Sequence, residues 1–451
     1  MADRLAASGI LLVGGASERF GSPKALATIA GETLAERGHR LLAETCDEVL
    51  PVGKDADGLE LSFPLLDDGV EERAPVLGVL AGLRAARHDL ALVLPIDCPL
   101  VTADALRALL DGGAVPQTGP LPGVYTKALL PELEARVARN ELSLRGVNET
   151  VLELDDTLLL NVNTRNDLLL AAVADWARET DDVRAVVLVG SYARRETPAD
   201  RWSDLDLLLF LDDPDRYVHD DAWIARFGSP VLTFLEPTSV ADRVERRVLY
   251  DDGVDVDFPL LPAEAGRELA TVAGVGTVLA RGYRVLHDEI GVADVLAEAA
   301  VPEPRELPDA AAFTQLASDF WHHALWTAKK LRRGEVFTAI SCLDGYVKWR
   351  LVTMLEWHAR AVDPTADTWH DGRFLERWGD PGALAALERA YAHYDVRDVA
   401  RGLWETIDLF QGVEEETAGR LGLAVRLDHP DLRRRIAEVV PDPRPTSTLW
   451  P

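Results

Sequence analysis

The 451-residue sequence has little cysteine and no long apolar segment. Its three cysteines, Cys46, Cys98 and Cys342, lie far apart, and the sequence contains no CxxC pair or Cys/His cluster. This pattern predicts neither a disulfide framework nor a zinc site. The first apolar run is too short for a signal peptide, and no run approaches the roughly 18 residues of a transmembrane helix. We therefore expect a cytoplasmic protein that does not insert into membranes.

Basic residues are also scarce, because 47 lysines and arginines stand against 76 aspartates and glutamates, for a formal net charge of -29. Nucleic-acid binding depends on Lys and Arg side chains that neutralise phosphates, so DNA and RNA are not expected partners. An acidic surface would attract a cationic small molecule. The same acidity would also follow from a need for solubility or from the composition typical of GC-rich genomes, and composition alone leaves these readings open.

A chain of this length is expected to fold into two or three domains. In residues 1–172, short apolar runs alternate with helical patterns. The apolar runs are 9–15, 48–53 and 90–97, and the helical patterns are 24–45, 74–88 and one that begins near Thr164. Continuous apolar strands that alternate with helices predict a Rossmann-like α/β domain with a parallel sheet covered on both faces.

The rest of the chain has two different patterns. Residues 173–300 contain closely spaced strand candidates, which predict a small mixed α/β sheet. These strand candidates are 183–190, 204–211, 230–237, 245–253 and 254–261. Residues 301–451 are predicted to form a helical domain, because 309–335 and 336–361 show long amphipathic patterns, and we expect their tryptophans and leucines in its core. The predicted fold class is α/β with a helical C-terminal domain.

A glycine-rich segment, LLVGGASERFGSPK, ends the first predicted strand. It places Gly14 and Gly15 at the strand end, followed by Ser17, Arg19 and Lys24. Glycines let the backbone approach phosphates and present N–H groups to them, and Arg and Lys neutralise phosphate charge. The spacing fits neither GxGxxG nor GxxxxGK[ST], which excludes the dinucleotide-binding and P-loop motifs. We predict a loop that binds the phosphates of a nucleotide.

This loop, with the later segments LVLPIDCPLV and NVNTRNDL, resembles the MobA-like nucleotidyltransferases, to which molybdenum cofactor guanylyltransferase belongs. The resemblance covers about residues 8–172. It implies that Asp97 binds Mg²⁺, that Asn163 lies near the metal, and that the nucleotide is ATP, GTP or CTP. The chain departs from the family at Ala74, where relatives have glycine, and in a closing motif that lacks its proline. A module that keeps the fold without the activity is therefore an alternative.

A second motif combines a Gly-Ser turn with two aspartates. Gly190 and Ser191 follow an apolar strand, and Asp204 and Asp206 are two residues apart on the next one. Side chains at i and i+2 of a strand share a face. Two neighbouring carboxylates repel each other unless a cation lies between them, and Mg²⁺ sites combine one or two carboxylates with substrate phosphates. We predict a Mg²⁺ site, with the turn, which precedes a helix-like stretch, holding the terminal phosphates.

A third carboxylate on a neighbouring strand would complete a two-metal site or serve as a base. The segment YDDGVDVDFPLL offers Asp257, with Asp255 as the second choice on the same face. We therefore assign Asp204, Asp206 and Asp257 as the candidate catalytic and metal-binding residues.

The order of Gly-Ser, Asp-x-Asp and a later strand aspartate resembles the polymerase-β-like nucleotidyltransferase superfamily. The segments GSYARRETPADRWSDLDL, YDDGVDVDF and FWHHALWTAKKLRRGE are similar to the aminoglycoside 6-adenylyltransferase (streptomycin adenylyltransferase) family, over about residues 175–440. The resemblance implies transfer of AMP from ATP-Mg²⁺ to an aminoglycoside hydroxyl, with release of pyrophosphate. Lys330 would be a candidate phosphate contact, and Asp344 and Glu356 candidate contacts to a cationic substrate, although each also suits a solvated or structural position.

Together, these motifs predict a Mg²⁺-dependent nucleotidyltransferase that uses ATP and a cationic small-molecule acceptor, with a second nucleotidyltransferase module at its N-terminus. Two other functions remain open. The acceptor could be a Ser, Thr or Tyr of a partner protein, which would make the reaction protein AMPylation. The N-terminal module could instead bind a nucleotide without catalysis and regulate its neighbour.

Overall fold

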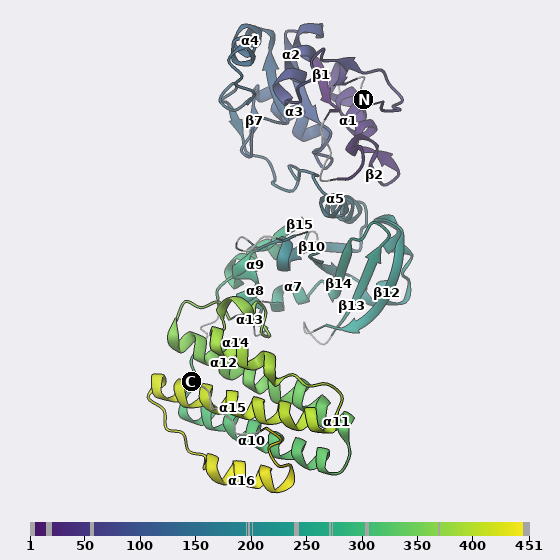
Figure 1. Cartoon of the computed structure of the whole chain (residues 1–451). Helices are drawn as coiled ribbons and strands as arrows, with labels where there is room; N and C mark the ends of the chain where they lie inside the picture. Colours follow the sequence, from purple (N-terminus) through teal and green to yellow (C-terminus); the bar gives the residue numbers. More distant parts are fainter. Residues whose placement is uncertain are drawn as a thin grey trace. The chain divides into compact units, whose positions relative to one another are not determined.

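The computed structural model forms two compact units, residues 1–303 and 304–451 (Figure 1). The first unit contains two main sheets, and the second is helical. The residues described are 5–14, 20–54, 58–194, 196, 199–200, 202–238, 243–269, 272, 274–302, 306–368 and 370–444. The predicted boundary between residues 300 and 301 lies close to the division between the two units. None of the helices in the described residues is long and apolar enough to cross a membrane.

The N-terminal sheet has the strand order β5-β4-β1-β6-β8, parallel except for the antiparallel edge strand β8. Its strands are β1 (Leu5–Leu12), β4 (Cys46–Gly53), β5 (Leu66–Asp67), β6 (Leu90–Pro95) and β8 (Gly123–Thr126). Helices α1 (Leu34–Thr45) and α3 (Ala103–Gly112) cover one face, and α2 (Pro75–Ala85) and α4 (Leu130–Ala138) cover the other. Two short strands, β7 (Val115–Pro116) and β9 (Val151–Leu152), pair outside this sheet. The predicted parallel sheet covered on both faces is confirmed.

The helix expected over residues 24–45 is wrong over residues 24–33, nearly its first half. Residues Lys24–Leu26 form a 3₁₀ turn, and β2 (Thr28–Ile29) and β3 (Glu32–Thr33) form a small hairpin. The hairpin turn places Ala30 and Gly31 at positive φ, which a helix cannot accommodate. Helix α1 begins only at Leu34, where Thr33 and Glu36 form a capping box.

Helix α5 (Arg165–Arg178) begins at the predicted place, with Thr164 as its N-cap. Its residues 169–177 are all buried, as expected for a helix with other elements packed around it. On one side of α5, Asp175 pairs with Arg37 of α1. On another side, α5 packs against strands of a second sheet, described below, and Trp176 stacks at 5.6 Å on Trp223, which lies in a 3₁₀ turn. The helix thus belongs to the cores around both sheets.

The Arg37–Asp175 ion pair provides a test of this shared core. Its side chains are only 14% and 10% exposed, and Arg37 Nη1 lies 3.1 Å from Asp175 Oδ2. Asp175→Ala would leave a buried guanidinium without its counter-charge, and should lower the free energy of unfolding by about 3 kcal/mol in urea titrations. The matched control is Glu134→Ala, which removes an exposed pair with Arg84 and should cost less than about 1 kcal/mol. Equal losses in the two variants would contradict this role of α5.

The second sheet has the order β12-β13-β14-β11-β10-β15, in which only β11 and β14 run parallel. Its strands are β10 (Val183–Val189), β11 (Leu205–Leu211), β12 (Pro230–Pro237), β13 (Val244–Tyr250), β14 (Asp255–Pro262) and β15 (Arg284–Asp288). Short helices flank it: α6 (Pro214–His219), α7 (Ala265–Glu268), α8 (Val275–Arg281) and α9 (Val292–Ala299). The mixed sheet agrees with the prediction, and β15 is an edge strand that the prediction missed.

The C-terminal unit is a bundle of long helices that run alongside one another (Figure 1). The helices of this unit within the described residues, long and short, are α10 (Ala310–Arg332), α11 (Val336–Ser341), α12 (Lys348–Val362), α13 (Leu375–Trp378), α14 (Pro381–Ala390), α15 (Val396–Leu421) and α16 (His429–Val439). A π-helical segment, Cys342–Val347, interrupts the pattern expected over 336–361. Phe320 stacks on Phe410 in the core, and Trp321 is buried, but Trp349 is 45% exposed, so the expectation that every tryptophan here is core is wrong.

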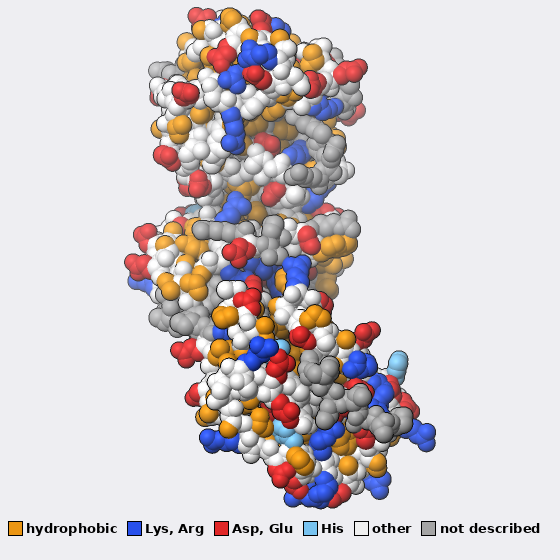
Figure 2. Space-filling model, turned by 60° about the vertical axis from the view of Figure 1, so that its left-hand side comes forward, with side chains coloured by type: hydrophobic (Ala, Val, Ile, Leu, Met, Phe, Trp, Pro, Cys, Tyr) orange, Lys and Arg blue, Asp and Glu red, His pale blue; other side chains and the backbone are white. Residues whose placement is uncertain are grey.

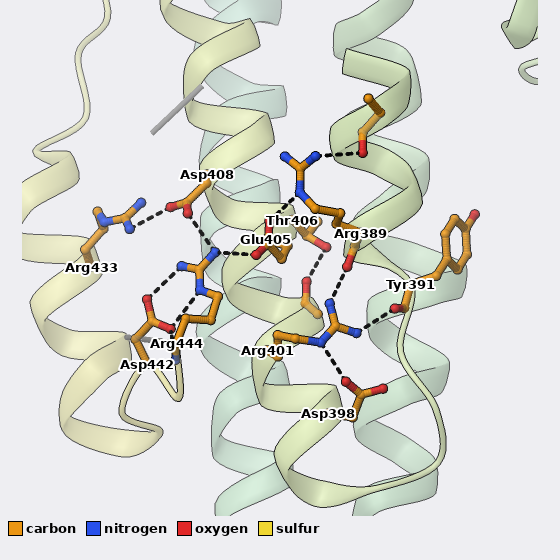
Figure 3. A network of polar contacts seen from close by, with 12 residues as sticks. Arg389, Tyr391, Asp398, Arg401, Glu405, Thr406, Asp408, Arg433, Asp442 and Arg444 are labelled. Atoms are coloured by element: carbon orange, nitrogen blue, oxygen red, sulfur yellow. Dashed lines mark hydrogen bonds and ion pairs between the residues drawn. The ribbon is translucent and has the colours of Figure 1, made fainter. Parts of the chain in front are cut away.

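Ion pairs attach α16 and the segment that follows it, up to Arg444, to this bundle (Figure 3). Arg444 lies 3.0 Å from Glu405 and 2.9 Å from Asp408, both on α15, and 2.7 Å from Asp442. Arg433 of α16 reaches the same Asp408 at 2.7 Å. Two arginines therefore share the largely buried carboxylate of Asp408 on α15.

Acidic and basic side chains are interspersed on the face drawn in Figure 2. Arg184 is typical of such surface arginines, because it pairs with both Asp212 and Glu289. Local pairing of this kind compensates arginines individually while the chain keeps its net charge of -29. This excess of negative charge would repel a partner that carries many phosphates.

Candidate active site

The three aspartates predicted to bind metal lie together in the second sheet. Asp206 on β11 faces Asp257 on the parallel strand β14 in register, and Asp204 immediately precedes β11. One carboxylate oxygen of each lies within 4.8 Å of the others. Asp255, the second choice for the third carboxylate, is on β14 but is not a member of this cluster.

The carboxylates of this cluster disfavour one another's ionisation. Burial raises the pKa of Asp206 to about 7, and the charges of Asp204 and Asp257 add to the effect. Burial likewise raises the pKa of Asp257 to about 7, against the opposing charge of Arg247. Asp257 Oδ1 is buried and has no hydrogen-bond partner. A buried carboxylate oxygen without a partner is costly, and a bound cation would remove that cost.

The Gly-Ser turn lies directly against this cluster. Strand β10 ends at Val189, and Gly190, with φ of +71°, starts a single 3₁₀ turn rather than the helix-like stretch expected. A Cβ atom on Gly190 would lie 1.8 Å from Asp206 Oδ2, so only glycine fits here. Ser191 is buried, and its Oγ donates to the carbonyl oxygen of Asp204 at 3.3 Å. The turn therefore fixes the backbone that carries the aspartates, and its role in phosphate binding stays a prediction.

Arg247 is a member of this site that sequence reasoning missed. It lies on β13 opposite Asp257, and its Nη2 is 3.1 Å from Asp257 Oδ2. It also pairs with Glu245 at 3.2 Å and with Glu236 of β12. A signal existed, because the DDG turn between the two strands sets a hairpin register that pairs Arg247 with Asp257.

The N-terminal sheet carries a pocket of about 430 Å³. Its lining includes residues at the carboxyl ends of β1, β4 and β6, the place where open parallel sheets bind ligands. The polar and glycine residues of this lining are Gly14, Gly53, Lys54, Asp68, Arg73, Gly78, Asp97 and Asn161. Of the loop residues predicted to bind nucleotide, Gly15, Ser17 and Arg19 lie outside the described residues.

Asp97 lines this pocket, and the charge of Lys24 acts on it. Burial raises the pKa of Asp97, while the charge of Lys24 and a hydrogen bond with Asn161 oppose the rise. Asn163 accepts a hydrogen bond from Lys24 Nζ at 2.9 Å and donates to Asn161 Oδ1 at 2.7 Å. The amide in contact with Asp97 is thus that of Asn161, which lies two residues before Asn163 in the same motif and was missed. The metal role of Asn163 stays a prediction.

A buried ion pair also lines the pocket and was missed. Lys54 follows β4, and its Nζ donates to Asp68 Oδ1 at 2.8 Å and to the carbonyl of Val70 at 2.6 Å. Its position after a parallel strand was the available signal, since side chains there face the ligand side of such sheets.

The candidates in the helical unit have partners of their own. Lys330 pairs with Glu335 at 2.7 Å and lies over the ring of Trp326. Asp344, within the π-helical segment, pairs with the buried Lys348, and Glu356 is half-buried on α12. These contacts suit the structural alternative, and the substrate roles of the three residues stay predictions.

Comparison with protein families settles the class of both modules. Residues 164–435, three fifths of the chain, match the family model described as streptomycin adenylyltransferase. The chain belongs to the streptomycin adenylyltransferase family. Residues 9–153 match the model of the MobA-like NTP transferase domain.

Individual relatives agree with these two assignments. Aminoglycoside 6-adenylyltransferase of Bacillus subtilis is 27% identical over 249 residues, which are 52% of this chain and 84% of that protein. A protein of Aquifex aeolicus described as a probable molybdenum cofactor guanylyltransferase is 31% identical over 173 residues, 35% of this chain and 86% of that protein. The crystal structure of an aminoglycoside 6-adenyltransferase from Bacillus subtilis matches with 16% identity and a TM-score of 0.31, covering 61% of this chain and 98% of that one.

The two resemblances read from the motifs are thus confirmed, and so is the fold class. The protein is a nucleotidyltransferase with two modules. The module of the streptomycin adenylyltransferase family, called the adenylyltransferase module below, contains the aspartate cluster, and the MobA-like module contains the 430 Å³ pocket. Helix α5 begins at the start of the second matched region. The adenylyltransferase module therefore starts with a helix that also packs into the core of the MobA-like module.

Proposed function

We propose that the adenylyltransferase module transfers AMP from ATP to a hydroxyl of a cationic small molecule and releases pyrophosphate, with an aminoglycoside as the first candidate acceptor. The observation that carries this proposal is the cluster of Asp204, Asp206 and Asp257, with its buried, unpartnered oxygen on Asp257. Aminoglycoside acceptors are supported by the names of the relatives and by the net charge of -29, which favours a cation.

The donor atoms of the cluster suit Mg²⁺, which prefers oxygen ligands and binds proteins through a few carboxylates together with substrate phosphates. Asp204 and Asp206 would hold it, with Asp257 as the third ligand or as the base. When bound, Mg²⁺ supplies positive charge for the transferred phosphoryl group and for the leaving pyrophosphate.

The residues of the chain would position the reactants and move one proton. The Gly190–Ser191 turn would hold the terminal phosphates of ATP beside the carboxylates. The acceptor hydroxyl oxygen forms a bond to the α-phosphorus, and the bond from that phosphorus to the β-bridging oxygen breaks as pyrophosphate leaves. If Asp257 is the base, it takes the hydroxyl proton.

For the MobA-like module we propose that a nucleoside triphosphate, ATP, GTP or CTP, binds the pocket between Gly14 and Asp97. Lys24, whose charge acts on Asp97, would contact its phosphates. The module would then either transfer a nucleotidyl group to an acceptor of its own or act as a nucleotide-binding regulator of its neighbour.

Pyrophosphate release tests these proposals directly. The purified full-length protein would be incubated with Mg²⁺, each nucleoside triphosphate in turn, and a panel of aminoglycosides that includes streptomycin. We expect release that requires ATP and one aminoglycoside, is abolished in Asp204→Ala and persists in Asp97→Ala. Loss in Asp97→Ala alone would assign the chemistry to the MobA-like module and contradict the proposal. Release with protein acceptors only would replace the aminoglycoside by a protein side chain.

A further inference from the structure

The two carboxylate oxygens of Asp257 lie in different surroundings, and one of them lies beside Arg247. The strands β13 and β14 pair these residues directly, and Arg247 Nη2 contacts Oδ2 at 3.1 Å. The other oxygen, Oδ1, is buried without a hydrogen-bond partner. Since this ion pair holds one oxygen of the carboxylate beside the guanidinium, it also sets where the unpartnered oxygen lies.

The guanidinium is itself held in place from both sides. Glu245 lies two residues before Arg247 on the same face of β13 and contacts it at 3.2 Å. Glu236 faces Glu245 across the β12–β13 pair and contacts Arg247 as well. Three carboxylates on three adjacent strands therefore surround one planar guanidinium, whose rigid fork can bind several oxygens at once.

We propose that Arg247 is a positioning residue of the metal site, one that holds Asp257 Oδ2 so that Oδ1 is presented to a divalent cation beside Asp204 and Asp206. This inference rests on the proposed function of that cluster. It deepens the function by assigning the orientation of the third carboxylate to a side chain that contacts neither metal nor nucleotide in this scheme.

The charge of Arg247 and its positioning of Asp257 predict opposite effects on metal affinity when the arginine is removed. Removal of a positive charge beside three carboxylates would by electrostatics alone strengthen the binding of a cation. Loss of the ion pair that orients Asp257 would weaken it, typically by 10- to 100-fold for groups that orient metal ligands. The direction of the change in metal affinity therefore separates the two effects.

The experiment measures Mg²⁺ and Mn²⁺ binding to the full-length protein without nucleotide, by calorimetry and by the electron paramagnetic resonance of Mn²⁺. Arg247→Met, which keeps length but neither charge nor donor, should bind both ions about tenfold more weakly. Arg247→Lys restores a donor to Oδ2 and should recover most of that loss. Arg184→Met is the matched control, because Arg184 is 35% exposed against 37% for Arg247 and also bridges two carboxylates on this sheet.

Each outcome bears on the proposal. Weaker binding in Arg247→Met alone, with unchanged thermal unfolding and partial rescue by lysine, supports it. Unchanged or tighter metal binding in Arg247→Met overturns it and leaves Arg247 as a counter-charge only. If the Arg247→Met protein unfolds, the Arg247→Lys variant decides. Metal binding by Arg247→Lys at the level of the wild type supports the proposal. Metal binding that is tenfold weaker overturns it, because the lysine has then failed to orient Asp257. If the Asp204→Ala variant bound metal as tightly as the wild type, the metal role of the cluster would be wrong, independently of Arg247.

Discussion

Replacement of Gly190 by alanine should inactivate the adenylyltransferase module. The added Cβ would lie 1.8 Å from Asp206 Oδ2 and 2.7 Å from its Cγ, so the carboxylate, the turn or both must move. A displacement of about 1 Å at reacting groups is enough to lower rates by about 100-fold, which is the smallest loss we expect. The positive φ of +71° adds about 1 kcal/mol of strain for a residue with a side chain. The measurement is pyrophosphate release at saturating ATP and acceptor.

Gly253→Ala is the matched control for this effect. Gly253 lies in the turn between β13 and β14 with φ of +85°, yet a Cβ there meets nothing within 4 Å. It should therefore lose about the same 1 kcal/mol of stability as Gly190→Ala from backbone strain, and keep its activity. If both variants lost activity equally, strain in the sheet rather than the clash with Asp206 would be the cause.

The aspartate cluster could be predicted because its information is local. Asp204 and Asp206 are two residues apart at the start of an apolar strand, so the strand period alone places them on one face. Asp257 begins another apolar run in the same way, and the parallel pairing of β11 with β14 brings the carboxylates to the same end of the sheet. Element types were likewise predictable where the apolar runs were long.

The missed residues enter their sites through the pairing of separate segments of the chain, which for Arg247 are the two strands joined by the DDG turn. Arg247 enters the site because β13 pairs with β14, and Asn161 contacts Asp97 because the segment before α5 returns to the end of β6. The helix expected from Lys24 failed for a local reason, since the turn at Ala30 and Gly31 requires positive φ and the capping box at Thr33 sets a later start. In the segment that begins at Lys24, backbone geometry therefore overrode an apolar pattern that suited a helix.

Neutralisation of Asp206 should have opposite effects on activity and on stability. Asp206→Asn keeps the shape of the side chain but removes a charge from a cluster whose oxygens lie within 4.8 Å. We expect pyrophosphate release to fall by on the order of 1,000-fold, because the variant loses a ligand of the Mg²⁺ that would stabilise the charge of the transition state. In the absence of divalent ions, however, the variant should be more stable than the wild type by about 1 kcal/mol, because repulsion among buried carboxylates is relieved. Addition of Mg²⁺ should then raise the unfolding temperature of the wild type only.

The pH dependence of this gain in stability distinguishes a repelled carboxylate from a structural one. The pKa of Asp206 is raised in the folded protein to about 7, above the value of about 4 for an unfolded chain. Between these values the folded state holds more protons, so the metal-free wild type should lose stability as pH rises from about 4 to 7. The advantage of Asp206→Asn should be full at pH 8 and vanish near pH 4. Asp212→Asn, at the other end of the same strand, is the control, because Asp212 pairs with Arg184 and its loss should lower stability slightly at pH 8 without affecting activity. A loss of stability in Asp206→Asn at pH 8 would show instead that Asp206 is a structural carboxylate, and would remove the main argument for a cation between the three aspartates.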